Sequence, residues 1–396
     1  MRILVVSLAN LANSGGEAVT SLRLARAFAE LGHAVTLLAP DANERNTAID
    51  CAPARVAMSF NLGRLGLPNS FNTLTQLWPA VRGAWCHDID LVYVRAGMLT
   101  FLFGVCLRWC SGVVVASEHH GWLAAERLMS GRHTWFAPLE RRLQIADARF
   151  ARVVRTVVPG IKALLVDGGI EPARINVIGN ASDTERIRPR ERNAALAAYK
   201  LSADRVYLGF VGSLVKWQGL DTVLRGFALL RARRPDTHLL IVGDGPQRAE
   251  LAAQVSDLGL TGAVTFSGNL AHDEIDAMLA CFDLSLLPTH TGAYTRIGRS
   301  PLKLREYAAA GRAVLAAHIV EVDTLESEPW IAYYTPGDAG DFALQAANIL
   351  AEPLQLAARG RAARAYAERH FAWPVIARQI LDTLPPARGT AGRFAC

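Results

Sequence analysis

The segment that decides the fold is Arg2–Ala39, which reads RILVVSLANLANSGGEAVTSLRLARAFAELGHAVTLLA. The apolar run at Arg2–Leu8 predicts a buried strand, and the polar, glycine-bearing stretch Asn10–Gly16 predicts a loop. Apolar residues recur at helical spacing over Ala18–Leu31, a glycine ends that helix, and Ala34–Ala39 is the next strand. A strand, a helix and a strand in this order form a βαβ unit, which predicts a parallel sheet with right-handed crossovers.

Further strands follow in two series, with the polar segment 189–202 between them as the expected interdomain linker. We therefore expect an α/β protein with two doubly wound domains, residues 1–190 and 191–370. Residues 371–396 should form a last helix and a tail. The other predicted strands are Leu91–Val94, Val113–Ala116, Val153–Val157, Arg174–Ile178, Val206–Val211, His238–Val242, Val264–Ser267, Leu284–Leu287 and Ala313–Ala317.

The composition is that of a globular protein with an affinity for anions. Of 396 residues, 51% are hydrophobic and 20% charged, and the net charge of +6 suits an anionic ligand or an acidic membrane surface. Lysine and arginine are spread along the chain, so nucleic acid is not expected. The start reads directly as a strand, and no CxxC occurs, which favours a reduced, cytoplasmic setting. The apolar stretch 99–116 is interrupted by Arg108 and predicts a buried helix and a strand rather than a membrane span.

The stretch Ser300–Gly311, SPLKLREYAAAG, predicts a short helix with a binding site at its start. Ser300 is expected as the N-cap and Pro301 as the first helical residue, so free N–H groups would attract an anion. Lys303 adds a positive charge, and Glu306 lies one turn further on the same face. A cation for a diphosphate beside a carboxylate for a ribose indicates a nucleotide site. The alternative is an ordinary amphipathic helix with a solvated lysine and glutamate.

Two loops of the first series carry polar or glycine residues that follow strands. Gly15 and Gly16 would let the backbone approach a ligand closely, although a plain tight turn explains them as well. Glu118, His119 and His120 follow the predicted strand 113–116, where a histidine could donate a hydrogen bond or move a proton. Adjacent residues of an extended chain point in opposite directions, so we expect one histidine to face the ligand. The alternative is a pair of surface or helix-capping histidines.

Three further patterns have a functional and a structural interpretation. The loop 212–219 combines glycines with Lys216, a pattern that suits a phosphate. The alternative is a lysine that is merely solvated. Residues 243–246 form a turn that we interpret as structural. The Asp88-Ile89-Asp90 string resembles a metal-chelating motif of some sugar transferases, but it precedes a strand, at the wrong end for a site in such a sheet. No metal is expected.

Several of these motifs, in this order, resemble those of GT-B fold glycosyltransferases of the large retaining family 4, also called group 1. The resemblance is carried by Ser14–Gly16, Ile178–Asp183, Phe210–Ser213, Ile241–Pro246 and Ser300–Gly311. It implies two Rossmann-like domains facing across a cleft, with the acceptor bound by the N-terminal domain and a sugar nucleotide by the C-terminal one. It also implies a last helix that returns to the N-terminal domain.

The resemblance assigns residue roles. Glu306 would bind the ribose hydroxyls, and Lys303 and the helix start at Leu302 would meet the diphosphate. The catalytic residues would be His120 and Glu306, with no metal and no cofactor beyond the nucleoside diphosphate sugar. Other donor contacts would come from Gly212, Ser213 and Lys216, and acceptor or sugar contacts from Gly15, Gly16, Glu118 and His119.

Three positions depart from the family pattern and affect the expected sugar contacts. Gly298 stands where many members have a first glutamate, and Ser213 where they have arginine. Gln218 stands at the usual lysine position, with Lys216 two residues earlier. A subgroup that acts in surface-polysaccharide assembly has a similar Gln-Gly pair.

The predicted function is therefore a retaining hexosyltransferase. It would use a UDP-sugar by preference, or a GDP-sugar, and a hydroxyl acceptor in polysaccharide, glycolipid or glycoside synthesis. The alternatives are a sugar-nucleotide epimerase on the same fold and a non-catalytic sugar-nucleotide-binding partner protein. Residues 55–85, rich in aromatics, leucines and arginines, are expected to form the acceptor side and to touch a membrane carrying a lipid-linked acceptor. The protein would then be cytoplasmic, or peripheral at the inner face of the membrane.

Overall fold

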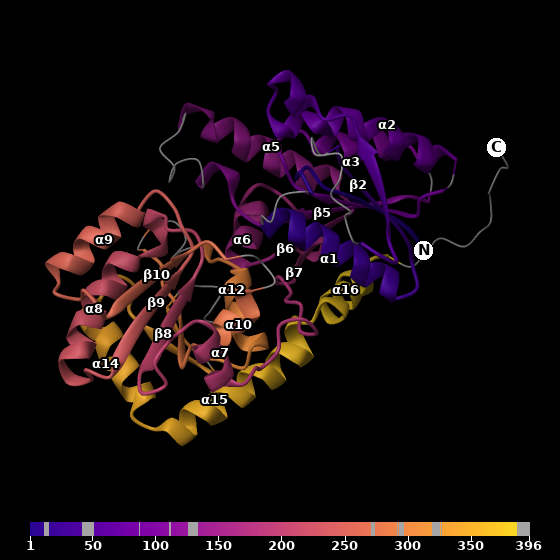
Figure 1. The fold of residues 1–396 in the computed structure, drawn as a ribbon. Coiled ribbons are helices and arrows are strands. Elements are labelled where there is room, and N and C mark those ends of the chain that lie inside the picture. The colour runs from indigo at the N-terminus through magenta and orange to yellow at the C-terminus, as the bar shows by residue number, and fades with distance from the viewer. Residues whose placement is uncertain are drawn as a thin grey trace. The chain divides into compact units, whose positions relative to one another are not determined.

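The computed structural model describes residues 1–11, 16–41, 51–86, 88–110, 112–125, 134–270, 274–290, 292, 297–318, 325 and 327–385. The chain divides into two compact units, each built on one parallel sheet (Figure 1). Unit 1 comprises Met1–Gly179 and Trp373–Cys396, and unit 2 comprises Asn180–Ala372. The division therefore falls before the expected linker. Residues 189–202 belong to unit 2 and contain helix α7 (Arg192–Ala198).

The sheet of unit 1 has seven strands in the order β3-β2-β1-β4-β5-β6-β7, all parallel. Strand β3 was not predicted. It lies at the sheet edge with most of its residues partly or fully exposed, so it lacks the continuous apolar run of a central strand. The strands are β1 (Arg2–Val6), β2 (Ala34–Pro40), β3 (Arg55–Ser59), β4 (Leu91–Arg95), β5 (Val114–His119), β6 (Val153–Thr156) and β7 (Ile175–Val177).

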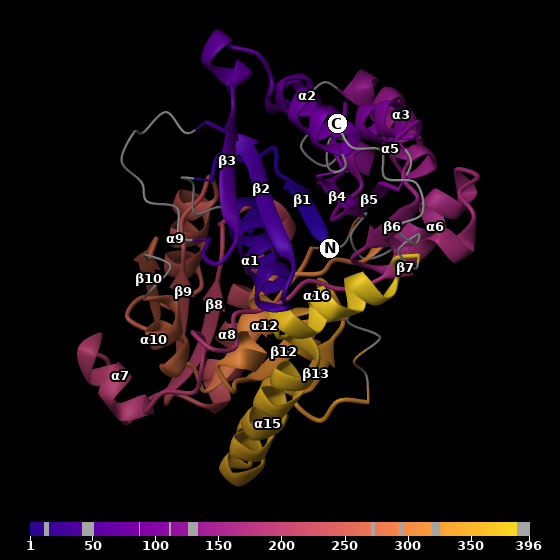
Figure 2. The same cartoon turned by 90° about the vertical axis from the view of Figure 1, so that its right-hand side faces the viewer.

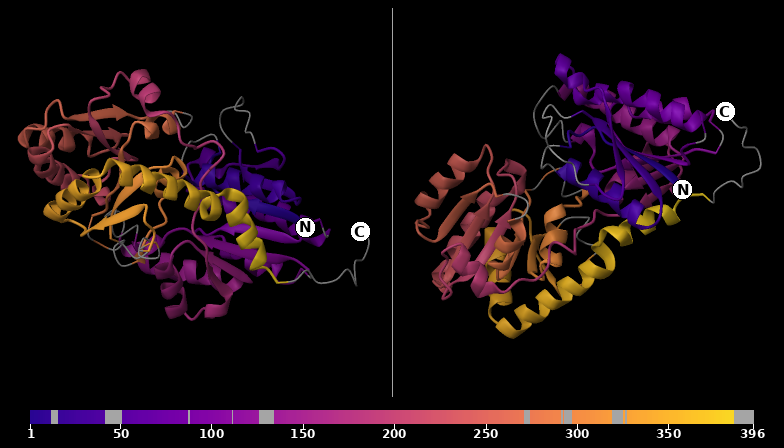
Figure 3. Two further views of the ribbon diagram at one scale, coloured as in Figure 1. Left: turned by 90° about the horizontal axis from the view of Figure 1, so that it is seen from below. Right: turned by 45° about the vertical axis from the view of Figure 1, so that its right-hand side comes forward.

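Helices cover both faces of this sheet. α1 (Gly16–Glu30) packs against α16 (Trp373–Asp382), the last helix among the described residues (Figure 3). α2 (Asn72–Trp85), α3 (Phe101–Leu107) and α5 (Ala137–Phe150) form the other layer (Figure 2). The remaining elements are α6 (Pro159–Asp167) and the 3₁₀ turns η1 (Leu62–Leu65), η2 (Asn69–Phe71), η3 (Thr134–Phe136) and η4 (Pro172–Arg174). No described helix of either unit has the length and apolar character needed to cross a bilayer.

The sheet of unit 2 has six parallel strands in the order β10-β9-β8-β11-β12-β13. They are β8 (Val206–Val211), β9 (Thr237–Val242), β10 (Val264–Gly268), β11 (Leu284–Leu287), β12 (Ala313–Ala317) and β13 (Ile331–Tyr334), of which β13 was not predicted. The helical elements are α8 (Leu220–Arg233), α9 (Arg248–Asp257), α10 (Ile275–Ala280), α12 (Leu302–Ala309), α14 (Ala339–Leu350), α15 (Pro353–Tyr366), the 3₁₀ turn η5 (Lys216–Gln218) and the π-helical turn η6 (Ala367–Phe371).

Side chains alternate between two cores, one on each face of this second sheet. Leu239 and Ile241 of β9 join the core under α8, α9 and α14. Leu240 and Val242 join the core under α10, α12 and α15. This alternation follows from the period of two in a strand, and it makes the unit a three-layer Rossmann-like domain.

Each sheet has a point where the strand order reverses, between β1 and β4 in unit 1 and between β8 and β11 in unit 2. In open parallel sheets, ligands bind beyond the carboxyl ends of the strands at such a point. In unit 2 these ends lead into the loop 212–219 and, through residues 288–301, into α12.

Candidate functional site

The start of α12 differs in detail from the prediction. The helix begins at Leu302, and Pro301 is its N-cap with extended backbone and no side-chain cap. Ser300 is therefore not the cap, and Pro301 is not the first helical residue. The helix ends as expected, with Gly311 in the left-handed region at φ +68° and the N–H of Arg312 donating to Tyr307 O. The first N–H groups of a helix have no acceptor inside it, so the start of α12 still presents donors to an anion.

Asn180 fixes the position of this helix start. Its backbone N–H donates to Ser300 Oγ at 3.0 Å, and its Nδ2 donates to Ser300 O at 2.7 Å. The buried Arg305 donates from Nε to Asn180 O at 2.5 Å and from Nη1 to Pro301 O at 3.2 Å. The site is therefore held by groups whose roles were not predicted, because they meet across more than a hundred residues of chain.

Lys303 points to the loop that follows β8. Its Nζ donates to Gln218 Oε1 at 3.1 Å and lies 4.0 Å from the ring centroid of Phe210. A Cβ on Gly212 would lie 2.6 Å from this Nζ, so the ammonium rests against the glycine backbone. Burial, together with the charge of Arg299, holds the pKa of Lys303 well below its usual range, while Glu306 opposes the shift. A diphosphate at this position would restore the charged form and gain a strong ion pair.

Glu306 lies one helical turn from Lys303, as predicted, and keeps part of its surface accessible. Burial raises the pKa of its carboxyl, and the charges of Arg186 and Lys303 oppose that shift. Within the described residues, no hydrogen bond or ion pair occupies the carboxylate oxygens. A carboxylate with unused acceptors in a largely desolvated place is suited to accept two hydroxyl donors of a ribose.

The loop after β8 carries the remaining predicted donor contacts. Ser213 and Lys216 are exposed, and Lys216 makes no ion pair within the part of the chain that the structure describes. The residue that the structure brings to Lys303 is instead the buried Gln218. Arg299 was not singled out in the sequence, yet its guanidinium lies 4.0 Å over the ring of Trp217 and adds a second cation to this region.

The glycines of the turn 243–246 allow two loops to pack tightly. A Cβ on Gly243 would lie 2.1 Å from Gly212 O, and one on Gly245 would lie 2.5 Å from Leu214 O. The N–H of Leu214 donates to Asp244 O at 2.9 Å. The turn therefore supports the loop that holds Gly212 beside Lys303, in agreement with its structural interpretation.

In unit 1, Glu118 is the centre of a buried polar cluster at the end of β5. The strand extends to His119, so Glu118 and His119 lie within it and not in the loop after it. Glu118 Oε2 accepts hydrogen bonds from Arg155 Nη1 at 2.7 Å and from the Tyr93 hydroxyl, and Oε1 pairs with His120 Nε2. Burial alone would raise the pKa of Glu118, but the charges of His120 and Arg155 outweigh it and lower the pKa to about 2. This carboxylate is thus committed to internal partners and positions them.

The two adjacent histidines have different surroundings. His119 is fully buried, with Nε2 beside Ser117 Oγ at 2.9 Å and Asp147 Oδ2 at 3.3 Å, and with Nδ1 beside Gln144 Nε2 at 3.2 Å. His120 follows the strand and keeps part of its surface accessible. Burial, followed by the charge of Arg95, lowers the pKa of the His120 imidazole well below its usual range, although Glu118 opposes this. Of the pair, His120 is the one that can meet a ligand.

Two expectations concern residues elsewhere in unit 1. Gly15 lies outside the described residues, and Gly16 is the first residue of α1. In the Asp88-Ile89-Asp90 string, Asp90 Oδ1 accepts from Arg2 Nη2 at 2.9 Å, and Asp88 lies 4.0 Å from the same guanidinium. In the described ranges, no three His, Cys, Asp or Glu side chains gather where they could hold a metal ion.

Comparison with known proteins identifies the family. Residues 205–352 match the family model of glycosyl transferases group 1, and residues 14–186 match that of glycosyltransferase family 4. The chain belongs to the family 4-like group 1 glycosyltransferases. As a glycosyltransferase, it is a transferase enzyme, and the predicted family and activity class are confirmed.

A relative and two solved structures extend this result. The glycosyltransferase is 27% identical to the 2-deoxystreptamine glucosyltransferase of Streptomyces kanamyceticus, over 89% of this chain and 94% of the relative. Its fold is similar to that of sucrose-phosphate synthase from Thermosynechococcus elongatus (TM-score 0.77, 20% identity, 96% and 97% of the two chains). It is also similar to that of Anabaena HepE in complex with UDP (TM-score 0.75, 20% identity, 97% and 99%). The predicted α/β GT-B fold is confirmed.

Proposed function

We propose that this glycosyltransferase transfers a sugar from a nucleoside diphosphate sugar, with UDP favoured over GDP, to a hydroxyl acceptor. One observation carries the proposal: the ammonium of Lys303 lies against the Gly212 backbone, one helical turn from the unoccupied carboxylate of Glu306. The UDP complex of the structural neighbour and the glucosyltransferase name of the relative support the same donor class.

The proposed chemistry assigns charge stabilisation to unit 2. As the bond between sugar and diphosphate breaks, negative charge builds on the diphosphate, and Lys303, Arg299 and the N–H groups at the start of α12 stabilise it. These groups supply the positive charge without a metal ion. Glu306 holds the ribose through its hydroxyls, so its contribution is to positioning and affinity. The backbone N–H of Ser213 is offered to the phosphates. That of Gly212 already donates to Val242 O at 2.9 Å, so Gly212 contributes the space that its missing side chain leaves beside Lys303. The exposed Lys216 serves as a secondary cation.

The proposed contribution of unit 1 is His120. With a lowered pKa the imidazole is neutral, and its one N–H, on Nε2, donates to Glu118 Oε1. Nδ1 is then free of a proton and can accept a hydrogen bond from a hydroxyl of the transferred sugar. Glu118 holds this ring through Nε2, and Arg155 in turn holds Glu118. We also propose that the sugar keeps its anomeric configuration in the product, and that the product belongs to a polysaccharide, glycolipid or glycoside.

The test is nucleotide binding followed by product analysis. Calorimetric titration with UDP, GDP and UDP-glucose should show a clear preference for one base, and a ligand at a hundred times its Kd should stabilise the fold by about 2.7 kcal/mol. Glu306→Gln should weaken nucleotide binding about tenfold or more, because a charged hydrogen bond is worth about 1.5 to 3 kcal/mol. Glu250→Gln, on the exposed side of α9, is the matched control and should bind like the parent.

Absence of binding to every nucleotide, or a Glu306→Gln variant with unchanged affinity, would refute the donor site. Nuclear magnetic resonance of the product reports the anomeric configuration and tests retention. Conversion of the donor to an epimer in the absence of acceptor would point to the epimerase instead.

A further inference from the structure

The solvent-facing side of α2 is apolar. Leu74, Trp78 and Trp85 recur at helical spacing on one face and are 48%, 69% and 71% exposed. The opposite face, with Gln76, Ala80 and Ala84 among others, is buried against the sheet. A surface helix normally presents charged or polar residues to water, so an aromatic outer face indicates a partner that covers it.

The same apolar character continues into the segment that precedes the helix. Each of five residues here is more than a third exposed: Met58 on β3, Leu65 on η1, Phe71 on η2, and Phe60 and Leu67 in the connections between these elements. Exposed tryptophans also follow α3, at Trp109, and lie on η3 before α5, at Trp135. α2, α3 and α5 cover one face of the sheet of unit 1, so the exposed tryptophans on or next to these helices belong to one helical layer (Figure 2).

The charge of this segment selects the kind of partner. From Cys51 to Cys86 the sequence contains no aspartate or glutamate, whereas it contains Arg55, Arg64 and Arg82. Arg82 is exposed in the last turn of α2, between the two tryptophans. Arg64 pairs with Asp41 at 2.6 Å, whereas Arg55 and Arg82 make no ion pair with the described residues. Tryptophan and leucine together with such arginines are typical of surfaces that lie in the headgroup region of an anionic membrane.

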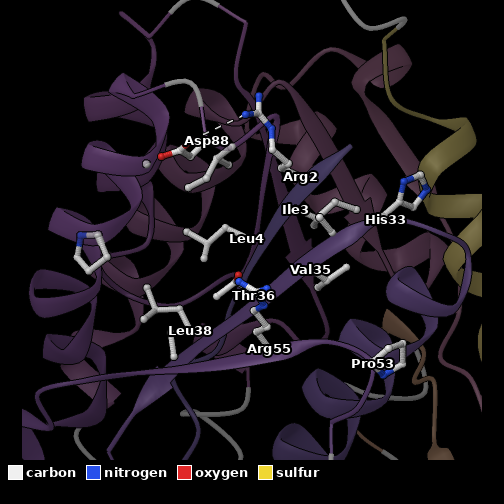
Figure 4. A pocket seen from close by; sticks show the side chains of 15 residues that line it. Arg2, Ile3, Leu4, His33, Val35, Thr36, Leu38, Pro53, Arg55 and Asp88 are labelled. Carbon is white, nitrogen blue, oxygen red and sulfur yellow. Dashed lines mark ion pairs between the residues drawn. The ribbon is translucent and has the colours of Figure 1, made fainter. Parts of the chain in front are cut away.

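A cavity of about 570 Å³ lies beside the same helix (Figure 4). Its apolar lining includes Leu4, Leu38 and Ala57 of the sheet and Pro79 of α2, and its charged groups include Arg2, Arg55 and Asp88. Figure 4 shows the Arg2 side chain reaching to Asp88 at one side of this space. Arg2 is also paired with Asp90 at 2.9 Å, whereas Arg55 makes no ion pair with the described residues. A lipid tail with an anionic headgroup matches an apolar wall beside this one unpaired arginine.

We propose that the exposed face of β3, η1, η2 and α2 docks on an anionic lipid bilayer, with Trp78 and Trp85 at the headgroup level. The apolar side chains enter the boundary of the acyl chains, and Arg82 interacts with lipid phosphates. The inference deepens the proposed function, because it places the enzyme where a lipid-linked hydroxyl acceptor is presented. Docking itself needs neither donor nor acceptor, so it is tested independently of the donor site.

The experiment measures binding of the full chain to vesicles by cosedimentation and by tryptophan fluorescence. Vesicles of equal parts phosphatidylcholine and phosphatidylglycerol should bind the protein at low salt, and vesicles of phosphatidylcholine alone should bind it more weakly. Trp78→Gln with Trp85→Gln should reduce the partition coefficient about tenfold or more, because two large apolar groups no longer enter the interface. Arg82→Gln should reduce it about fivefold on the anionic vesicles.

Matched controls lie in unit 2. Arg361→Gln removes one exposed charge from α15, and Leu354→Gln removes an exposed leucine from the same helix. Both should bind vesicles like the parent, and circular dichroism with UDP titration shows whether each variant is folded. No binding to anionic vesicles at low salt, or equal binding by the tryptophan variants, overturns the proposal. It is also overturned if the parent self-associates in solution and the tryptophan variants become monomeric, since the face then joins two copies of the chain.

Discussion

The Nζ atom of Lys303 lies 3.1 Å from Oε1 of Gln218, which joins the start of α12 to the loop after β8. The loop follows β8 and the helix follows β11, and these two strands are neighbours at the switch point of the second sheet. The glutamine supplies a neutral acceptor at the position where the family pattern has a lysine. A second ammonium there would repel Lys303, whereas the amide oxygen orients it. The site therefore holds one lysine, Lys303, whose ammonium is oriented by an amide, instead of two lysines that repel each other.

The close approach of Gly212 to Lys303 gives the first prediction. In Gly212→Ala, the new Cβ would lie 2.6 Å from Nζ, and the backbone is in the left-handed half of the map at φ +145°. The lysine must move away from the phosphate position, so we expect UDP affinity to fall about tenfold and stability to fall by about 1 kcal/mol. Calorimetry and thermal unfolding measure the two effects.

Gly259→Ala is the control for this change. Gly259 has φ +66° and follows α9, but nothing lies within 4 Å of the place its Cβ would take. The Gly259→Ala variant should lose about as much stability as Gly212→Ala and keep the affinity of the parent for UDP. Equal losses of affinity in both variants would show that backbone strain, and not the contact with Lys303, is responsible.

The shifted pKa of Lys303 predicts a pH dependence of donor binding. In the free protein the pKa of Lys303 is lowered, so its charge is lost as pH rises through that lowered value. A bound diphosphate favours the charged form and raises the pKa again. UDP binding should therefore weaken with rising pH and take up a proton in the range where the free lysine is partly neutral.

Titrations in two buffers of different ionisation enthalpy detect this proton uptake. Lys303→Met should abolish the alkaline loss of affinity and the uptake together, with a lower affinity at all pH values. Lys216→Met, which removes an exposed cation from the neighbouring loop, should keep both. Uptake that persists in Lys303→Met would assign the titration to another group.

The sequence predicted the parallel sheets and the shared face of Lys303 and Glu306, because both depend on local spacing. It did not predict that Asn180 would hold Ser300, since residues 120 apart in the chain meet only through the topology of unit 2. It also did not predict the contact of Arg155 with Glu118, because this contact depends on the pairing of β6 with β5. The N-cap assignment of Ser300 was wrong because its hydroxyl accepts from Asn180 instead of capping α12. Local propensity identified the helix, and tertiary hydrogen bonds decided its first residue.

The buried Glu118 predicts a loss of stability in acid. Its pKa is lowered from its ordinary value of 4.5 to about 2, so the folded state favours the ionised carboxylate. A depressed pKa contributes stability that is present above about 4.5 and disappears as pH falls toward 2. The contribution is about 3 kcal/mol at neutral pH by linkage. Urea unfolding between pH 7 and 3 should show this decline.

Glu118→Gln should be less stable at pH 7, because Arg155 remains buried without its carboxylate, and its stability should depend less on pH in this range. Glu250→Gln, which changes an exposed residue of α9 in unit 2, should follow the pH profile of the parent. An unchanged acid profile in Glu118→Gln would mean that other carboxylates govern the decline.

Substitutions of the two adjacent histidines should affect different properties, stability for His119 and turnover for His120. His119→Ala removes a fully buried ring and leaves Gln144, Ser117 and Asp147 without a shared partner, so we expect a loss of about 2 to 4 kcal/mol of stability. His120→Ala removes a partly accessible ring at the end of β5 and should cost less stability. Because His120 is proposed to act on the transferred sugar, its loss should lower kcat about a hundredfold with nearly unchanged UDP affinity. A His120→Ala enzyme with parental kcat would place the sugar contact elsewhere, and a His119→Ala enzyme that is fully stable but inactive would exchange the two roles.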